Sequence, residues 1–286
     1  VLRNNLHLLE CFNTVTTCYS GDRFPEAGPF TGILLDAPCS GWGTAEKHPR
    51  VTTLWTEERT GPLISLQRRL LERAFELLAP GGRMVYSTCT THVRENEEQA
   101  EWAARELGAE VEPLDEFEGF VNETLNGCLR IHGGEHGGQS FFLTRLGKPG
   151  GRQPEREGEA AHGAANTTEA ELETQSWFRD LGLDVRNLPP GRLERSQGSV
   201  YFLPSRVSEA LPSAVTRRGR YVGTEHKRNV RLTARLRSVL PSPDQEAGWN
   251  VEDVATLRHV IAGQSFPVQS AGRSLALYWR DLPLGL

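Results

Sequence analysis

Apolar and polar positions alternate along the first half of the chain in blocks that predict strands and helices in turn. Two short apolar runs, at residues 30–36 and 83–90, are typical of buried strands. Between them, residues 57–79 carry apolar side chains three or four positions apart, which is the spacing of one helix face. Strand, helix and strand in this order indicate parallel β-α-β units, so we predict an α/β sheet. The other elements predicted before residue 147 are a helix at residues 1–9, a β-branched run at residues 13–20, a helix at residues 95–108 and, on the sheet edge, an antiparallel hairpin of strands at residues 128–132 and 140–146.

The second half of the chain has a different composition. Residues 147–167 contain few large apolar side chains, as a linker does. Residues 168–286 hold short strand candidates and a helix candidate at residues 251–261. We therefore divide the chain into an α/β domain at residues 1–146, the linker, and a smaller α+β domain at residues 168–286.

Charge is distributed unevenly along the sequence. The net charge of −5 gives no overall nucleic-acid signature. Between Arg206 and Arg237, however, nine lysines and arginines stand against two acidic residues. This basic region, with Tyr221 available to stack on a base, favours a phosphate-binding surface. A solvated basic face is the alternative interpretation.

Composition narrows the class of protein further. The hydrophobic content of 37% and the charged content of 24% are typical of a globular protein. The five cysteines have no regular spacing, so we expect free thiols and a cytoplasmic location rather than a disulfide framework. No apolar run reaches the length of a membrane span, and the eight histidines lack metal-ligand spacing, so no membrane or metal is predicted. We also expect a monomer. The chain opens on Val1 and ends in mid-pattern for a hairpin, which favours a fragment cut at both ends.

Two cysteines follow predicted strands. Cys39 comes three residues after Asp36, in a Pro-Cys-Ser-Gly loop, and Cys89 lies at the end of the second apolar run. Because ligands of open α/β sheets bind at the carboxyl ends of parallel strands, Asp36, Cys39 and Cys89 could converge at one rim. Free cysteines are more often buried packing residues. The turn-forming residues Pro38 and Gly41 nevertheless favour a shaped loop around Cys39 over a core position.

These segments carry a resemblance to a known family. The sequence DAPCSG, followed by KHPR, a long helix that runs into APGGRMVYSTCT, and then ENEE, is similar to the RNA 5-methylcytosine methyltransferases of the RsmB and RsmF type. The resemblance spans residues 1–146 and implies a Rossmann-like class I methyltransferase sheet, N-terminally incomplete, that uses S-adenosylmethionine. Residues 168–286 resemble, more weakly, the RNA-binding extension of the RsmF-like branch, which includes a PUA-like fold. The resemblance therefore implies an RsmF-like fragment without its N-terminal part.

The resemblance also implies a covalent mechanism. The cysteine of the TC motif, Cys89, would attack carbon 6 of a cytosine, so that carbon 5 can take a methyl group from S-adenosylmethionine. Cys39 would help to release the product, and Asp36 would lie between cofactor and base. Asp22 matches the acid that approaches the adenine of the cofactor, where a carboxylate can accept a hydrogen bond from the exocyclic amine. The implied substrate is RNA, with ribosomal RNA favoured and transfer RNA left open.

The sequence also departs from the family pattern, and two alternatives stay open. The family's Gly-rich cofactor loop is missing, because APGGR follows a helix, whereas such a loop follows a strand. One alternative is a DNA cytosine-5 methyltransferase, in which Cys39 would attack. The absence of an ENV motif between Cys39 and Cys89 argues against it. The other alternative is an RNA-binding module with an inactive methyltransferase domain, against which the presence of both cysteines and Asp36 argues.

Overall fold

The computed structural model describes residues 1–54, 56–115, 121–125, 127–132, 138–151, 168–186, 188–226, 229–241, 248–264, 276–280 and 282–285. The chain forms two compact units. We call residues 19–161 the cysteine unit, because they include Cys39 and Cys89, and residues 1–18 with 162–286 the terminal unit.

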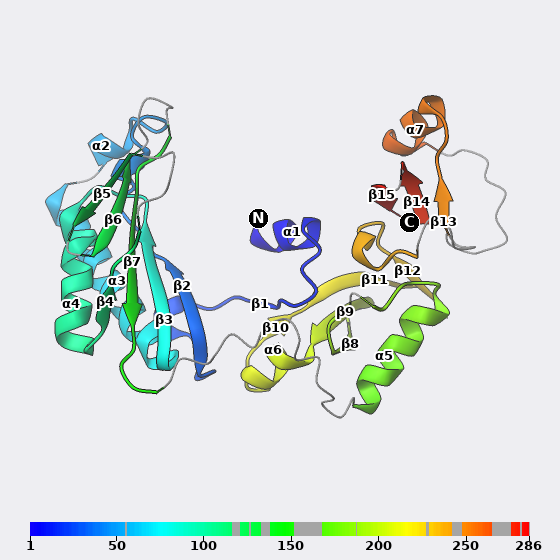
Figure 1. The fold of residues 1–286 in the computed structure, drawn as a ribbon, viewed down its shortest axis with the longest axis horizontal. Helices are drawn as coiled ribbons and strands as arrows, with labels where there is room; N and C mark the ends of the chain where they lie inside the picture. The colour runs from blue at the N-terminus through cyan, green and yellow to red at the C-terminus, as the bar shows by residue number, and fades with distance from the viewer. Residues whose placement is uncertain are drawn as a thin grey trace. The chain divides into compact units, whose positions relative to one another are not determined.

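The cysteine unit is a mixed α/β structure in which α3 and α4 lie on one face of a sheet (Figure 1). Its described helices are α2 (Val51–Leu54), α3 (Glu57–Leu77) and α4 (Glu97–Leu107), with the short 3-10 turns η1 (Gly21–Arg23), η2 (Trp42–Thr44) and η3 (Val93–Glu95). Its described strands are β2 (Phe30–Asp36), β3 (Leu78–Thr88), β4 (Glu110–Glu112), β5 (Val121–Leu125), β6 (Cys128–His132) and β7 (Phe141–Gly147).

The sheet is built around the parallel pair β2 and β3, which α3 connects. Its strand order is β2-β3-β7-β6-β5, with β4 alongside β7. Strand β7 is antiparallel to both β3 and β6. The predicted β-α-β unit and the antiparallel pair are therefore confirmed. The pair does not form the edge of the sheet, because β7 lies directly beside β3 and β5 follows β6.

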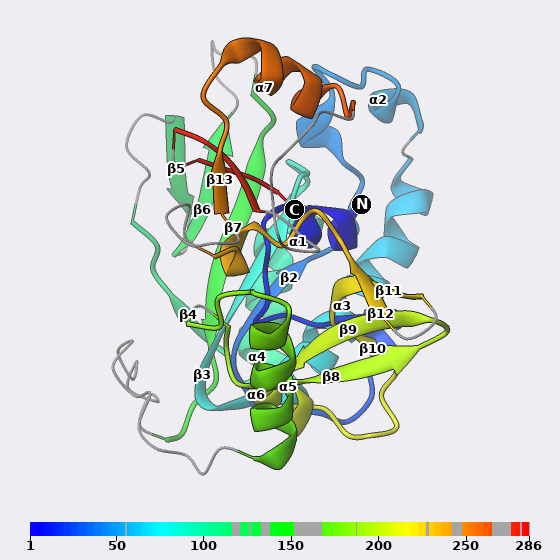
Figure 2. The same cartoon turned by 90° about the vertical axis from the view of Figure 1, so that its right-hand side faces the viewer.

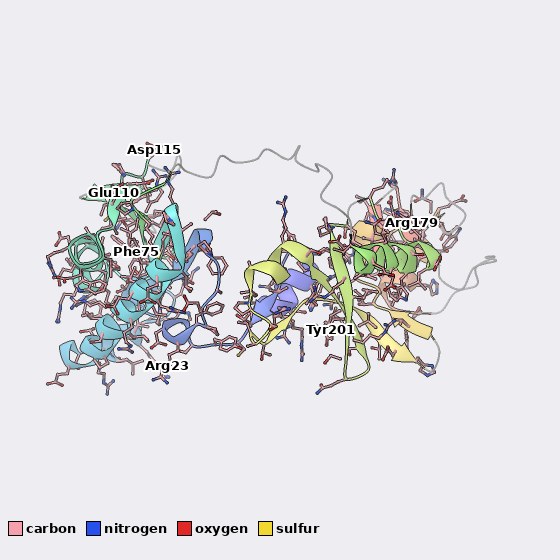
Figure 3. All side chains as sticks on the ribbon, turned by 90° about the horizontal axis from the view of Figure 1, so that it is seen from below. Arg23, Phe75, Glu110, Asp115, Arg179 and Tyr201 are labelled. Carbon is pink, nitrogen blue, oxygen red and sulfur yellow. The ribbon has the colours of Figure 1, made fainter. Side chains whose placement is uncertain are left out.

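Helix α3 forms where the apolar spacing predicts it. Leu71 and Ala74 on its inner side are buried, and Phe75, which Figure 3 labels, packs against the same core. Helix α4 ends before Gly108, whose φ of 69° lies in the left-handed region that favours glycine. The core is completed by side chains from the strands, namely Met84, Tyr86, Phe142 and Leu146.

Strand β2 differs from its prediction as a buried strand. Ile33 and Leu35 pack partly against the core, whereas Leu34 is 73% exposed. In the described part of the chain β2 pairs with β3 alone, so it stands at an edge of the sheet. The continuous apolar run predicts a strand covered on both faces, whereas one face of β2 is open to solvent.

The terminal unit combines small antiparallel and mixed sheets with short helices. Its described elements are α1 (Leu2–Leu8), β1 (Thr16–Thr17), α5 (Glu169–Asp180), β8 (Gly191–Ser196), β9 (Ser199–Pro204), α6 (Ser205–Ala210), β10 (Arg217–Arg218), β11 (Arg220–His226), β12 (Asn229–Leu232), η5 (Arg237–Val239), β13 (Gly248–Asn250), α7 (Val254–Ile261), β14 (Ala276–Trp279) and β15 (Leu282–Gly285). The strand orders are β12-β11-β9-β8, β13-β14-β15 and β1-β10.

Helix α5 lies beside the β12-β11-β9-β8 sheet in two views (Figures 1 and 2). It begins with a capping box, in which the Thr168 hydroxyl accepts from the Glu171 N–H and the Glu171 carboxylate accepts from the Thr168 N–H. Phe178 on this helix is fully buried, and its ring packs against that of Phe202 in β9. Strand β9 is one of the short strands expected in residues 168–286.

Residues 1–18 lie in the terminal unit, although the sequence analysis places them in the α/β domain. Strand β1 pairs with β10, so that Thr16 stands opposite Arg218. Phe12 is buried, and its ring centroid lies 5.5 Å from that of Phe202. These contacts hold the segment in the terminal unit. The predicted linker at residues 147–167 lies mostly outside the described ranges, so its boundaries stay a prediction.

Removal of one core side chain should destabilise the cysteine unit. Leu71 is 0% exposed, so Leu71→Ala leaves a cavity between α3 and the sheet. We expect the free energy of unfolding to fall by about 2–5 kcal/mol. Amide hydrogen exchange in α3 and β3 measures this change. Leu54→Ala, at a position that is 52% exposed, is the control and should have little effect; equal losses in both variants would contradict the described core.

Candidate active site

Strands β2 and β3 end side by side, and their register aligns the residues that follow. Asp36 is paired with Ser87, the Ala37 N–H donates to the Ser87 carbonyl at 3.0 Å, and the Ser87 hydroxyl donates to Asp36 Oδ1 at 3.3 Å. Both strands run in the same direction, so the loops after them begin at one rim of the sheet. Asp36 is exposed there.

The two thiols meet at this rim. Cys39 lies in the loop after β2 and Cys89 directly after β3, and their Sγ atoms are 3.3 Å apart, within hydrogen-bond distance. The convergence expected from the strand ends is therefore confirmed. Both side chains are half-buried, and neither is in a disulfide.

The hydrogen bond between the two thiols shifts their pKa values in opposite directions. Donation from Cys39 lowers the pKa of Cys89 to about 7, even though burial and the carboxylates of Asp36 and Glu95 act in the other direction. The same hydrogen bond, together with burial, raises the pKa of Cys39 well above its usual range. Cys89 is therefore the more readily ionised thiol of the pair, with Cys39 as its hydrogen-bond donor.

The loop after Cys39 is closed against Cys89 by glycines. Gly41 has a φ of 74°, in the left-handed region, and starts η2. The Gly43 N–H donates to the Cys89 carbonyl at 3.0 Å, and the Ser140 N–H donates to the Gly43 carbonyl at 2.9 Å. A Cβ at Gly43 would lie 2.5 Å from the Ser140 carbonyl oxygen and 2.8 Å from that of Cys89. This close approach requires glycine, and it joins three loops of the site.

A buried polar network under the thiols was missed by the sequence analysis. Glu95 in η3 is fully buried, and its Oε2 accepts from the Ser40 N–H at 2.9 Å and from Gln67 Nε2 at 3.0 Å. The Ser40 and Thr90 hydroxyls are hydrogen-bonded at 2.8 Å. Glu95 opens the predicted helix at residues 95–108, where the sequence gives no signal of its burial. Gln67 lies on the predicted inner face of α3. A polar residue among the apolar positions of that face was the one sequence signal that could have indicated a buried hydrogen-bond network.

Asp22 lies in η1, apart from this network. Its Oδ2 accepts from Arg69 Nε of α3 at 3.2 Å, and its Oδ1 accepts from the Ser20 hydroxyl. Hydrogen bonds from Ser20 and Arg69 hold the pKa of Asp22 below its usual range. The structure thus places Asp36, Cys39 and Cys89 together, while the partners of Asp22 are Ser20 and Arg69.

A family profile described as 16S rRNA methyltransferase RsmB/F matches residues 1–147. The chain belongs to this RsmB/F family. Ribosomal RNA small subunit methyltransferase F from Pectobacterium atrosepticum is 37% identical over 160 residues, which are 54% of this chain and 33% of that protein. The protein of the same name from Salmonella agona is 38% identical over 154 residues, 52% of this chain and 32% of that protein. The RsmB/F-family chain spans about a third of the length of the curated relatives it matches.

Solved structures give partial matches to this RsmB/F-family chain. NSun6 from Pyrococcus horikoshii, solved with SFG, is 33% identical and covers 41% of this chain and 29% of that chain, with a TM-score of 0.35. A methyltransferase homolog protein from the same organism is 34% identical and covers 42% of this chain and 39% of that chain, with a TM-score of 0.34. Scores at this level support no argument from fold.

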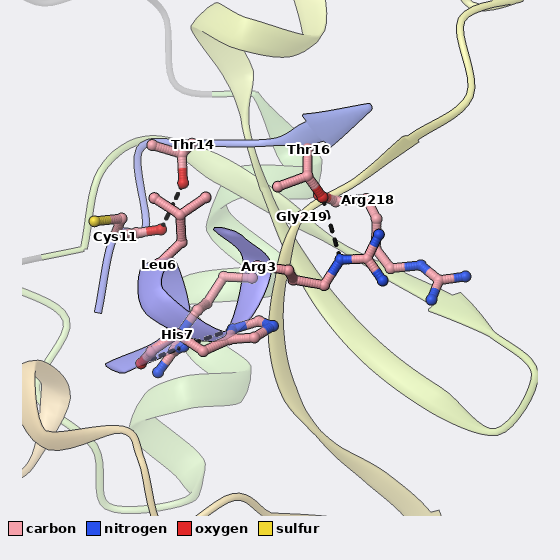
Figure 4. Close-up of a pocket in the computed structure, with 9 residues that line it drawn as sticks. Arg3, Leu6, His7, Cys11, Thr14, Thr16, Arg218 and Gly219 are labelled. Carbon is pink, nitrogen blue, oxygen red and sulfur yellow. Dashed lines mark hydrogen bonds between the residues drawn. The ribbon is translucent and has the colours of Figure 1, made fainter. Parts of the chain in front are cut away.

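The basic region of this RsmB/F-family chain contributes partly to packing. In the terminal unit, α1 and the strands β10 and β11 line a small pocket (Figure 4). Arg220 at this pocket is 3% exposed, and its guanidinium donates to the His7 carbonyl at 2.7 Å. Burial lowers the pKa of both Arg220 and His7. Arg220 is thus directed into the unit, whereas Lys227 and Arg228 lie outside the described residues.

Over the residues with a described position, no helix is long and apolar enough to cross a membrane. In the same residues, no group of three or more histidine, cysteine, aspartate or glutamate side chains is placed to hold a metal ion.

The hydrogen bond from Cys39 predicts a measurable effect on Cys89. Cys39→Ala removes the donor that stabilises the Cys89 thiolate, so the pKa of Cys89 should rise from about 7 toward the ordinary thiol value of about 8.5. The rate of iodoacetamide labelling of the Cys89 peptide, followed by mass spectrometry across pH, measures this pKa. Cys39→Ser, whose hydroxyl can still donate, should cause a smaller shift. An unchanged midpoint in Cys39→Ala would show that Cys39 does not stabilise the thiolate.

Proposed function

We propose that this chain carries the covalent-catalysis part of a methyltransferase that acts on carbon 5 of cytosine in RNA. Membership of the RsmB/F family supports methyl transfer to RNA. The names of the curated relatives refer to ribosomal RNA of the small subunit, which favours ribosomal RNA as the substrate. Transfer RNA is the second substrate class to be tested.

The observation that carries the proposal is the 3.3 Å contact between the two thiols at the ends of parallel strands. Carbon 5 of cytosine is a weak nucleophile. Addition of the Cys89 thiolate to carbon 6 moves electron density onto carbon 5, which can then react as an enamine-type carbon. With a pKa of about 7, Cys89 supplies the required thiolate at neutral pH. The raised pKa of Cys39 makes it the less readily ionised thiol, which favours Cys89 over Cys39 as the nucleophile.

Cys39 is suited to the second half of the reaction. After methyl transfer, a base takes the proton from carbon 5, the electron pair re-forms the double bond between carbons 5 and 6, and the Cys89 sulfur leaves as a thiolate. The Cys39 thiol lies within hydrogen-bond distance of that sulfur, so it can donate to the departing thiolate and lower the barrier to release.

The residues present fit S-adenosylmethionine in part. Asp22 has one partner on each carboxylate oxygen, which leaves acceptor capacity for an adenine amine. Asp36 is exposed at the end of β2, beside the thiols. We propose that Asp22 and Asp36 contribute to holding this cofactor, which supplies the methyl group when bound.

Two assignments of architecture belong to the same proposal. We infer that the cysteine unit is part of a Rossmann-like class I methyltransferase sheet, because its parallel strands place the site at their carboxyl ends. We also infer that residues 168–286 form an RNA-binding region with a PUA-like part. The basic side chains between Arg206 and Arg237 support RNA as the ligand of that region.

Trapping on RNA that contains 5-azacytidine tests the proposed roles. The wild-type chain should form a covalent complex, Cys89→Ala should lose it, and Cys39→Ala should keep it, because only the attacking thiol is needed for the bond. Denaturing gel electrophoresis detects the complex. Cys18→Ala, at an exposed cysteine of the terminal unit, is the control and should behave as wild type.

Two outcomes of the trapping would contradict the proposal. A covalent complex that survives Cys89→Ala and disappears in Cys39→Ala would assign the attack to Cys39. RNA binding with no covalent complex in any variant would favour the RNA-binding module with an inactive methyltransferase domain.

A further inference from the structure

Glu95 has a position that the proposed mechanism leaves unexplained. It lies in η3, six residues after Cys89, and is 0% exposed. A buried carboxylate is costly unless a cation or several hydrogen bonds stabilise it. Within the described ranges, Glu97 has such a cation, because Arg130 binds both of its oxygens at 2.6 and 2.7 Å. The partners of Glu95 are neutral donors, Ser40 and Gln67.

Those donors flank Cys39. The Ser40 N–H, on the residue after Cys39, donates to Glu95 Oε2 at 2.9 Å. Gln67 Nε2 donates to the same oxygen at 3.0 Å and to the Pro38 carbonyl, on the residue before Cys39, at 2.9 Å. Glu95 and Gln67 therefore fix the backbone on both sides of the Cys39 thiol.

The same carboxylate ties this loop to the segment after β3. The Tyr86 hydroxyl donates to the Glu95 carbonyl at 2.7 Å, which anchors η3 to β3. The Ser40 and Thr90 hydroxyls join the residues that follow each cysteine. The loop has no regular secondary structure between β2 and η2, so the distance between the two thiols depends on such tertiary contacts, and those of Glu95 are among them.

We propose that Glu95 is a positioning residue that holds the Cys39 loop so that the Cys39 thiol can donate to Cys89. The effect of Glu95 on catalysis rests on the proposed function. Its effect on the position of the Cys39 loop does not, because that can be measured on the chain without RNA or cofactor. Its consequence for the reaction is that loss of Glu95 impairs both formation of the attacking thiolate and release of the product.

The charge of Glu95 and its positioning effect act on Cys89 in opposite directions. As a negative charge, Glu95 disfavours the Cys89 thiolate, as Asp36 does. As an anchor, it favours the thiolate, because it keeps Cys39 in place as the donor. Among the residues whose positions are described, Tyr86 is the other titratable group that interacts with the two thiols; burial raises its pKa, so it stays neutral. A variant that removes only the charge of Glu95 and a variant that also removes its hydrogen bonds should therefore differ in their effect on the pKa of Cys89.

Two substitutions at Glu95 test the proposal through the pH dependence of Cys89 labelling. Glu95→Ala removes the anchor, and we expect the labelling midpoint to rise by about one pH unit. Glu95→Gln keeps an oxygen that can accept from Ser40 and Gln67 but removes the charge, so its midpoint should stay at the wild-type value or fall. If both variants lowered the midpoint, Glu95 would act through charge alone, and the proposal would be wrong. An unchanged midpoint in Glu95→Ala would also overturn it.

Controls separate this effect from a general loss of structure. Glu97→Ala removes a buried carboxylate from the same segment and breaks its bond with Arg130, so it should lower thermal stability without moving the Cys89 midpoint. Gln67→Leu removes the donor to Pro38 and Glu95 at nearly constant volume and should raise the midpoint even if Glu95→Ala does not fold. If Gln67→Leu left the Cys89 labelling midpoint unchanged, the hydrogen bonds of Gln67 would not hold the Cys39 loop in position.

A second readout links the inference to catalysis. With RNA that contains ordinary cytidine, Glu95→Ala should accumulate a covalent complex relative to Glu95→Gln, because release is impaired when Cys39 is displaced. If the labelling shifts appear but the wild-type chain forms no complex even with 5-azacytidine RNA, the proposed function fails and the positioning role stands. If the complex forms in the wild type but neither readout differs between Glu95→Ala and Glu95→Gln, the positioning role fails and the proposed function stands.

Discussion

The parallel register between β2 and β3 determines where the chemistry of this chain lies. Because Asp36 stands opposite Ser87, the third residue after Asp36 and the second after Ser87 come to the same rim, and both are cysteines. A shift of one residue in either strand would move Cys39 away from Cys89 and turn Asp36 to the other face. The core that fixes this register lies between α3, α4 and the sheet, so packing well below the rim maintains the 3.3 Å contact between the sulfur atoms.

The contact matters because the surroundings of Cys89 otherwise oppose its ionisation. Burial and two nearby carboxylates favour the neutral thiol, and donation from Cys39 outweighs them. One interaction thereby gives two thiols with different properties, a thiolate at Cys89 and a proton donor at Cys39. An addition and elimination sequence needs both, since the sulfur that attacks must later leave. The buried hydrogen bonds of Glu95 and Gln67 help to keep this arrangement in place, and their partners in the described part of the chain are neutral groups.

Much of this arrangement could be predicted from local sequence signals. The apolar spacing of α3 and the apolar runs before Cys39 and Cys89 were sufficient to predict a parallel β-α-β unit with both thiols at one rim of the sheet. The Glu95 network was not predictable, because the burial of a glutamate depends on how α3, η3 and the Cys39 loop pack. The exposure of Leu34 and the packing of residues 1–18 in the terminal unit likewise depend on pairing between distant segments, which the local pattern does not encode. Charge counting alone could not show that Arg220 points inward.

The central claim is that the two thiols share one proton unequally. Carbon-13 NMR of chains labelled at cysteine Cβ, titrated across pH, measures the ionisation of each thiol separately. We expect Cys89 to titrate near pH 7, with Cys39 still protonated when Cys89 has fully ionised. Titration of Cys39 before Cys89, or of both near the ordinary thiol value, would contradict it.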